Sequence, residues 1–215
     1  MKGLILAIPN KGRLRKPIME ILESINIKPL DDDRVYLSNT TMEGVQLLSI
    51  RAVDIPTYVY YGIADMGITG KDIIEESGFE FYELIDMKFG LCNLVLAVKE
   101  DSPYNNPLQL PQGIKVATEF PNITKKFFNN LGIKVEIIVL RGAVEIAPLL
   151  GLSDCIVDLS TTGETLKKNG LKSIAIIMKS SARLICNKVS YKTKYNEVKK
   201  IEELLVKACE NIRVL

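Results

Sequence analysis

Residues 155–166 read CIVDLSTTGETL: an apolar run, one acidic residue, a loop of small residues and the start of a helix. An apolar run of this length predicts a buried strand, and the glycine permits the turn into the helix. A strand followed by a short loop and a helix is half of a βαβ unit, whose strands pair in parallel. This segment therefore predicts an α/β fold.

The same alternation extends along the rest of the chain, as two successive βαβαβα series. The runs at 91–98 and 178–183 are the points where the chain is expected to cross between two lobes. We predict lobe I from residues 1–90 plus 180–215 and lobe II from residues 91–179, with mainly parallel sheets and an active-site cleft between the lobes. Strands are expected at 4–8, 47–50, 64–68, 91–98, 115–118, 135–140, 155–157, 174–178 and 184–186. Helices are expected at 12–25, 71–76, 122–131, 144–150, 164–169 and 195–213, and a short helix is expected to end with residues 59–61.

Composition excludes several classes of protein. Apolar residues make up 47% of the 215 residues and charged residues 25%, as in ordinary globular proteins. A net charge of +2 does not favour nucleic acid or a membrane surface as a partner. The apolar runs are shorter than the ~18 residues of a membrane helix, and the N-terminal run is too short for a signal peptide. We therefore expect a cytoplasmic protein.

The absence of histidine limits the chemistry further. The sequence contains no histidine, so Ser-His-Asp and Cys-His catalysis and histidine-ligated metals are excluded. Its four cysteines are far apart and form no CxxC pair, so buried free thiols are expected rather than a zinc site or disulfides. Catalysis must then depend on carboxylates, Lys, Arg, backbone amides or a cation held by oxygen ligands.

The loop at 158–165 suits a ribose phosphate. A helix N-terminus offers free N–H groups to a phosphate, Gly163 lets the backbone approach closely, and the threonine hydroxyls add donors. Asp158, at the end of the strand, is placed to accept hydrogen bonds from two neighbouring sugar hydroxyls. The structural alternative is an N-capped helix with Thr162 or Ser160 as the cap. The candidate phosphate-binding residues are Asp158, Ser160, Thr161, Thr162, Gly163, Glu164 and Thr165.

This loop resembles the phosphoribosyl pyrophosphate loop of phosphoribosyltransferases. The common version of that loop has two adjacent acidic residues before the small residues. Here Asp158 is the only acid, and Val157 occupies the other position. The difference argues against the commonest phosphoribosyltransferase fold.

Cationic residues follow two other expected strands. Lys11, Gly12 and Arg13 follow the first strand, and Arg51 follows the strand at 47–50. Lysine offers a point charge and arginine a planar fork, and both match phosphate oxygens. The alternative for residues 11–13 is a solvated turn.

Acidic residues near strand ends have two open interpretations. Asp65 lies within the strand expected at 64–68 and Asp72 follows it; each could serve a ligand or form a helix cap or buried ion pair. Glu145 is expected near the start of a helix, where an acid is favourable with the helix dipole, so capping is its plainer interpretation.

Taken together, these segments closely resemble one family, the ATP phosphoribosyltransferases. The resemblance is to the short form of the enzyme and extends over nearly the whole chain in the family's order. Asn10 departs from the family pattern, which usually has Pro or Ser directly before the Lys. The resembling stretches are IPNKGRL at 8–14, RAVDIPTYV at 51–59, ADMGITGKDII at 64–74, KVATEFPNIT at 115–124, GAVEIAPLLGLSDCIVDLSTTGETLKKNGL at 142–171 and SSARLICNKVSYK at 180–192.

The resemblance implies a fold and a reaction. The family has two α/β lobes built like a type II periplasmic binding protein, with both chain ends in the first lobe. It is a pentosyltransferase family: adenine N1 of ATP attacks C1 of phosphoribosyl pyrophosphate and releases pyrophosphate, in the first step of histidine biosynthesis. Mg²⁺ is the implied cofactor, held mainly by substrate oxygens, with its protein ligands unknown.

The resemblance also implies roles for individual residues. Arg13, Glu145 and Asp158 are the expected catalytic residues, and the loop at 158–165 is expected to hold the ribose phosphate on lobe II. Candidates for ATP and pyrophosphate on lobe I are Lys11, Gly12, Arg13, Arg34, Arg51 and Asp72.

Partners follow from the same resemblance. The short form is expected to work as a homodimer within a hetero-octamer, with a regulatory subunit resembling histidyl-tRNA synthetase. No nucleic acid or membrane partner is expected. The competing hypotheses are a non-catalytic solute-binding domain of the same two-lobed shape, which would not need residues 11–13 or the phosphate loop, and a different phosphoribosyltransferase.

Overall fold

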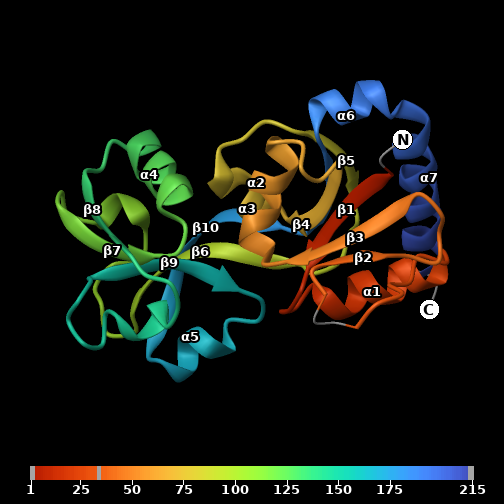
Figure 1. Ribbon diagram of the computed structural model, residues 1–215. Coiled ribbons are helices and arrows are strands. Elements are labelled where there is room, and N and C mark those ends of the chain that lie inside the picture. The colour runs from red at the N-terminus through yellow and green to blue at the C-terminus, as the bar shows by residue number, and fades with distance from the viewer. Residues whose placement is uncertain (1–2, 33–34, 213–215) are drawn as a thin grey trace. The chain divides into compact units, whose positions relative to one another are not determined.

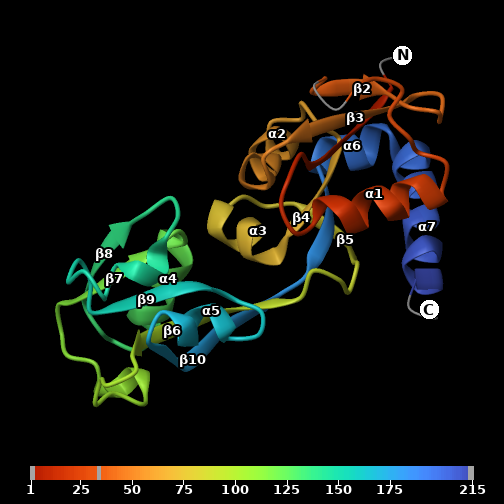
Figure 2. The ribbon, with the colours of Figure 1, turned by 90° about the horizontal axis from the view of Figure 1, so that it is seen from below.

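The computed structural model describes residues 3–32 and 35–212. The chain divides into two compact units: unit 1 comprises Met1–Gly90 and Ser181–Leu215, and unit 2 comprises Leu91–Ser180. Each unit is built on its own β-sheet with helices packed against it (Figures 1 and 2). The predicted α/β class and two-lobed organisation are confirmed.

Unit 1 contains a six-stranded sheet in the order β2-β3-β1-β4-β11-β5. Strand β1 lies parallel to β3 and β4, whereas β2, β11 and β5 pair antiparallel with their neighbours. The strands are β1 (Leu4–Pro9), β2 (Leu37–Asn39), β3 (Val45–Ile50), β4 (Met66–Gly70), β5 (Tyr82–Asp86) and β11 (Ala182–Cys186), and the helices are α1 (Arg15–Ser24), η1 (Ala52–Asp54), α2 (Ile55–Tyr60), α3 (Lys71–Ser77), α6 (Lys188–Thr193) and α7 (Tyr195–Ile212).

Unit 2 contains a five-stranded sheet in the order β10-β6-β9-β7-β8. Strand β7 lies parallel to β8 and β9, while β6 pairs antiparallel with both β9 and β10. The strands are β6 (Cys92–Lys99), β7 (Ile114–Thr118), β8 (Val135–Val139), β9 (Cys155–Ser160) and β10 (Leu171–Ser180), and the helices are η2 (Pro107–Gln109), α4 (Pro121–Asn130), η3 (Val144–Ile146) and α5 (Glu164–Lys168).

Apolar residues lie on both faces of each sheet. Successive side chains of a strand point to opposite sides, so the consecutive apolar residues of these strands supply both faces. In β1, Leu6 and Ile8 pack with α1 and α7 on one face, and Ala7 packs with α2 on the other. In unit 2, one face of the sheet packs against α4 and the other against η3 and α5. Each sheet is therefore the middle layer of a three-layer unit.

The sheets are mixed, and the expectation that they would be mainly parallel was wrong in that respect. The chain enters unit 2 through β6 and leaves it through β10, and these two strands run antiparallel. On its return to unit 1, β11 inserts antiparallel between β4 and β5. The parallel pairs are confined to β1 with β3 and β4, and β7 with β8 and β9.

Residues 144–150 do not form the expected α-helix. Only Val144–Ile146 are helical, as a 3₁₀ turn. Pro148 lacks the N–H that would bond to the Val144 carbonyl in a continuous α-helix. The preceding Ala143 has a φ of +49°, so the chain does not enter the turn as a regular helix does.

Two further expectations concern the cysteines and the membrane. Each of the four cysteines is buried and free, as predicted. None of the helices in residues 3–32 and 35–212 has the length and apolar character that crossing a membrane requires.

Asp65 lies just before the first residue of β4 and is almost fully buried. Its carboxylate accepts hydrogen bonds from the Ile5 amide at 2.8 Å and the Ser190 hydroxyl at 2.7 Å, and it pairs with Lys194 Nζ at 2.8 Å. These contacts join β1, β4, α6 and the start of α7. Of the two interpretations of Asp65, the geometry supports the buried ion pair.

We predict that Asp65→Ala lowers the free energy of unfolding by about 2–4 kcal/mol, because it leaves a buried amide, a hydroxyl and an ammonium without their shared acceptor. Urea denaturation of the parent and variant measures the loss. The exposed Asp54→Ala is the matched control and should change stability by less than about 0.5 kcal/mol. Equal stability of Asp65→Ala and the parent would contradict the structural role.

Candidate functional site

The predicted cations of unit 1 gather at one edge of its sheet. Because β1, β3 and β4 are parallel, their carboxyl ends meet at the same edge, the usual position of ligand sites in such sheets. Lys11–Arg13 follow β1, Arg51 follows β3, and Asp72 lies two residues beyond β4. Gly12, with a φ of +88°, provides the left-handed turn from the strand toward α1.

Arg13 and Asp72 form an ion pair at this edge. The distance from Arg13 Nη2 to Asp72 Oδ1 is 3.7 Å; the arginine side chain is 37% exposed and the aspartate side chain 1%. Asp72 lies in the first turn of α3, where the helix dipole favours a carboxylate. A Cβ on Gly70 would lie 2.2 Å from Asp72 Oδ1, so only glycine leaves room for the carboxylate in this position.

Two further cations have exposed positions at the same edge. Lys11 and Arg51 are exposed, and neither forms an ion pair within residues 3–32 and 35–212. Arg34 lies outside the described residues. Arg13 is paired with Asp72, whereas Lys11 and Arg51 add positive charge to this edge. The edge is therefore suited to bind phosphate groups.

The predicted phosphate loop of unit 2, residues 158–165, has the strand–loop–helix form expected from the sequence. Strand β9 carries Asp158 at its fourth position, and α5 begins at Glu164. Gly163 has a φ of +80°, and the Glu164 amide donates to Thr162 Oγ1 at 3.4 Å. Val157 is fully buried in the unit 2 core, which explains why no second acid stands there. Most of the predicted loop residues reach the surface: Thr161, Thr162, Glu164 and Thr165 are exposed, and Asp158, Ser160 and Gly163 partly so.

Asp158 lies in an acidic environment. Burial raises the pKa of its carboxyl to about 6, against the opposing effect of the Leu159 amide that donates to it at 2.7 Å. The charges of Glu119 and Glu145 raise the pKa of Asp158 as well. Glu145 and Glu119 therefore lie close enough to Asp158 for their charges to act on it.

Sequence reasoning did not single out Glu119. It directly follows Thr118, the last residue of β7, at the edge where β8 and β9 also end. The buried Thr118 hydroxyl donates to the Val157 carbonyl at 2.7 Å and accepts from the Phe120 amide at 2.9 Å, which fixes the backbone on both sides of Glu119. An acid directly after a predicted parallel strand was the signal that could have identified it.

The segment before Glu145 has an unusual backbone. Gly142 has a φ of +146° and Ala143 one of +49°, conformations that residues with side chains rarely adopt. A Cβ on Gly142 would lie 3.9 Å from Glu119 Oε1, so the segments after β7 and β8 approach each other closely. Backbone strain of this kind is concentrated at functional sites in proteins.

Carboxylates near the phosphate loop offer oxygen ligands to a metal. Within residues 3–32 and 35–212, no group of three or more His, Cys, Asp or Glu is arranged to hold a metal ion by itself. Mg²⁺ commonly binds through one or two carboxylates together with substrate phosphates. Single carboxylates at the edge of unit 2 fit that kind of binding.

Comparison with protein families identifies a match over most of the chain. The family model HisG, described as ATP phosphoribosyltransferase, matches residues 51–207. A curated relative named ATP phosphoribosyltransferase, from Halothermothrix orenii, is 44% identical over 99% of this chain and 96% of its own length. Another of the same name, from Methanocaldococcus jannaschii, is 44% identical over 94% of this chain and 71% of its own length.

Comparison with solved structures identifies proteins of similar fold. The chain is similar to one in the ATP phosphoribosyl transferase (HisG:HisZ) complex from Thermotoga maritima, with a TM-score of 0.87 and 33% identity, over 97% of this chain and 99% of the other. The periplasmic aliphatic sulphonate binding protein SsuA from Escherichia coli has a TM-score of 0.61 at 15% identity, over 100% of this chain and 70% of the other. The second similarity establishes a shared fold only.

We predict that Asp158→Asn stabilises the protein at alkaline pH. The pKa of Asp158 is raised from 3.8 to about 6, so its charged form is disfavoured by folding. The protonated form carries no such penalty, and stability is therefore lost as pH rises through about 6. At pH 8 the asparagine variant should be more stable than the parent by about 1–3 kcal/mol, and at pH 4 the difference should nearly vanish.

Chemical denaturation at both pH values measures this difference. The exposed Glu136→Gln in β8 removes one negative charge from the same unit and serves as the control. A variant that is less stable than the parent at pH 8 would contradict the proposed environment of Asp158.

Proposed function

Because the chain belongs to the ATP phosphoribosyltransferase family, we propose that the two groups of residues described above divide the work of that reaction. The reaction transfers the phosphoribosyl group to N1 of ATP in the first step of histidine biosynthesis. The bond from C1 to the pyrophosphate oxygen breaks, pyrophosphate leaves with the electron pair, and the adenine nitrogen bonds to C1. The adenine nitrogen is already nucleophilic, so the lack of histidine in the chain is no obstacle.

We assign the ribose phosphate to the loop that begins with Ser160. The support is its position: a glycine-containing turn with exposed hydroxyls after β9, at the carboxyl edge of three parallel strands. In this assignment the backbone amides and hydroxyls of Thr161–Thr165 bind the phosphate. Asp158, at the base of the loop, accepts hydrogen bonds from ribose hydroxyls.

We assign stabilisation of the sugar cation to the acids near Asp158. Positive charge develops on the ribose as pyrophosphate leaves, and carboxylates nearby favour that charge. Asp158, Glu145 and Glu119 supply them on this proposal, because the charges of Glu119 and Glu145 act on Asp158. The energetic cost of bringing three acids together is then offset when the cationic ribose forms.

We assign ATP and the departing pyrophosphate to the cations of unit 1. The support is the gathering of Lys11, Arg13 and Arg51 at one sheet edge, where Asp72 holds Arg13 in place. Gly12 allows the turn that presents the two neighbouring cations. Arg34 remains a candidate from the sequence alone.

Mg²⁺ is the proposed cofactor. Its chemical contribution when bound is to neutralise negative charge on the pyrophosphate. We expect substrate oxygens to provide most of its ligands, with Asp158 or Glu145 as candidates for the remainder. The protein side chains bind and orient the substrates around it.

A second kind of subunit is the proposed partner. The similar chain from Thermotoga maritima was solved as a HisG:HisZ complex, which supports a hetero-oligomer for this chain as well. From the family resemblance we propose that the partner is a regulatory subunit resembling histidyl-tRNA synthetase. The proposed assembly is a hetero-octamer that contains homodimers of this chain, in the cytoplasm.

We predict that Thr162→Val raises KM for phosphoribosyl pyrophosphate about fivefold to a hundredfold, with less than a twofold change in KM for ATP. The lost hydroxyl donor is expected to contribute ~1–3 kcal/mol to binding of the ribose phosphate. Pyrophosphate release from ATP, phosphoribosyl pyrophosphate and Mg²⁺ measures both constants. Thr57→Val, an exposed threonine in α2, is the control.

The same assay on the parent protein tests whether it has the proposed ATP phosphoribosyltransferase activity. Pyrophosphate release that requires both substrates supports the proposal, whereas no release from folded parent protein would refute it. Equal changes in both KM values for Thr162→Val would remove the loop from the phosphoribosyl site and leave the activity standing.

We predict that Arg13→Ala lowers kcat at least a hundredfold while the thermal midpoint shifts by only a few degrees. An arginine that stabilises charge developing on the leaving pyrophosphate acts mainly in the transition state. Lys16→Ala removes a nearby exposed cation on α1 and should retain nearly full activity. A parental kcat for Arg13→Ala would exclude this residue from the site.

A further inference from the structure

The segment SSARLICNKVSYK at 180–192 contains polar residues to which no role has been assigned. The cations Lys11, Arg13 and Arg51 at the edge of the unit 1 sheet are called the proposed anion site below. Strand β11 lies between β4 and β5, so that Arg183 is opposite Thr69 of β4 and opposite Asp86 of β5. Because Ala182 is paired with Gly70, the last residue of β4, the start of β11 lies at the same edge as Asp72. Ser181 and Arg183 are therefore placed beside the proposed site rather than behind it.

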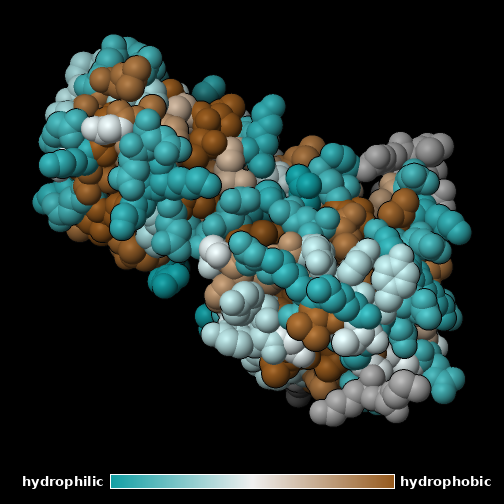
Figure 3. Space-filling model, turned by 90° about the horizontal axis from the view of Figure 1, so that it is seen from above, coloured by the Kyte–Doolittle hydropathy of each residue, from teal (hydrophilic) through white to brown (hydrophobic). Residues whose placement is uncertain are grey.

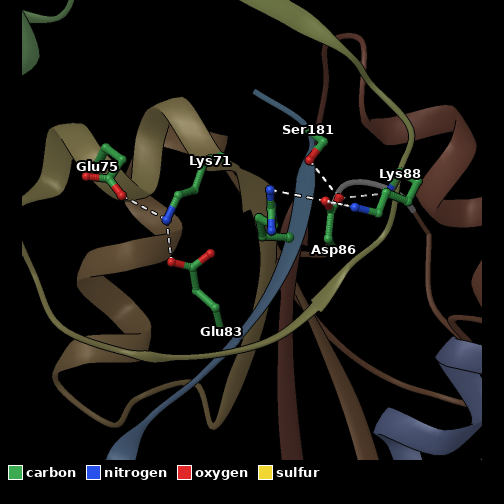
Figure 4. A network of polar contacts seen from close by, with 7 residues as sticks. Lys71, Glu75, Glu83, Asp86, Lys88 and Ser181 are labelled. Carbon is green, nitrogen blue, oxygen red and sulfur yellow. Dashed lines mark hydrogen bonds and ion pairs between the residues drawn. The ribbon is translucent and has the colours of Figure 1, made fainter. Parts of the chain in front are cut away.

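Asp86 is the centre of a polar cluster at this edge (Figure 4). Its carboxylate accepts from the Ser181 hydroxyl at 2.7 Å and from the Lys88 amide at 3.0 Å. It also pairs with Arg183 Nη2 at 3.2 Å and with Lys88 Nζ. Partial burial opposes ionisation, but the contacts from Lys88, Ser181 and Arg183 outweigh it and lower the pKa of Asp86 to about 2. The carboxylate is therefore charged throughout the neutral range.

Ser181 connects this cluster to α3. Its carbonyl accepts a hydrogen bond from the Lys71 amide at 3.0 Å, at the first residue of the helix. Lys71 Nζ in turn pairs with Glu75 at 2.8 Å and with Glu83 of β5 (Figure 4). The first turn of α3 is thus held at its backbone by Ser181 and at its side chain by two acids.

Asp72 follows Lys71 directly, and its carboxylate faces Arg13 across 3.7 Å. That separation is longer than a direct hydrogen bond, so a shift in the first turn of α3 changes how closely Asp72 and Arg13 pair. Packing does not leave Asp72 free to compensate, because its carboxylate lies against Gly70 and is buried. The position of Arg13 therefore depends on the position of this turn.

We propose that Asp86 is a positioning residue for the anion site: it binds Ser181, Ser181 holds the first turn of α3, and that turn presents Asp72 to Arg13. The inference rests on the proposed role of Arg13 in binding pyrophosphate.

Two other roles for Asp86 make different predictions. A purely structural role predicts lost stability without a specific effect on the site. A purely electrostatic role predicts that neutralising Asp86 releases Lys88 and Arg183 and strengthens anion binding.

The test is a double-mutant cycle between Ser181→Ala and Arg13→Ala, read out as the dissociation constant of pyrophosphate with Mg²⁺ by calorimetry. Ser181→Ala removes the bond to Asp86 without changing any charge. It should weaken pyrophosphate binding about fivefold in the parent, as expected for one lost hydrogen bond. In the Arg13→Ala background it should change binding less than twofold, because residues that act through one another are not additive.

Asp86→Asn is the second variant and should also weaken binding in the parent. Asp65→Asn is the stability control: it disturbs a buried ion pair at the other end of β4, and should lower the unfolding midpoint while leaving pyrophosphate affinity within twofold of the parent. If Asp86→Asn does not fold, the Ser181→Ala cycle decides alone.

Additive effects of Ser181→Ala and Arg13→Ala, or unchanged binding in Ser181→Ala, would overturn the proposal. So would tighter pyrophosphate binding by Asp86→Asn that weakens as salt is added, which is the electrostatic outcome. Unchanged binding in Arg13→Ala would overturn it as well and would remove Arg13 from the anion site. Turnover by the parent protein is measured separately, so failure of this inference and failure of the proposed function remain distinguishable.

Discussion

Parallel pairing of β1 with β3 and β4, and of β7 with β8 and β9, determines which residues of this chain can meet. Segments that are far apart in sequence follow the carboxyl ends of these strands, and parallel strands place those ends at one edge. Lys11 and Asp72 become neighbours of one edge in this way, and Glu119 and Asp158 of another. The antiparallel strands serve a different purpose, since β6, β10 and β11 carry the chain from one unit to the other and back.

The two edges differ in charge, and this difference gives each its chemistry. In unit 1 the exposed charges are mainly cationic, and the acid Asp72 is buried beneath Arg13. At the edge of unit 2 the acids Glu119, Glu145 and Asp158 are present, and on our proposal backbone amides and hydroxyls bind the phosphate there.

Much of the fold and part of the site could be predicted from the sequence. Long apolar runs such as 91–98 and the spacing of α1 and α7 reveal strands and helices directly. Strands β2 and β5 and helix α6 were missed because they are short and lack a continuous apolar pattern; β5 holds its place through pairing with β11, whose residues lie nearly a hundred positions later. Glu119 was missed for a similar reason: its neighbours Glu145, in η3, and Asp158, in β9, come from distant parts of the sequence. Asp65 and Asp72 look alike in the sequence, and only the structure shows that Asp65 pairs with Lys194 at one end of β4 and Asp72 with Arg13 beyond the other.

The insertion of β11 between β4 and β5 also affects how the protein is made. Strand β5 leaves the ribosome early, yet its neighbour in the sheet is encoded after the whole of unit 2. At ~5–20 residues per second, the wait is on the order of ten seconds. During that interval unit 2, which is continuous in sequence, is completed first, while the edge of β4 is still open. The edge of β4 in nascent unit 1 therefore stays unpaired during this interval. An unpaired strand edge can pair with other chains, so this is the stage of synthesis at which binding by a chaperone would be most useful.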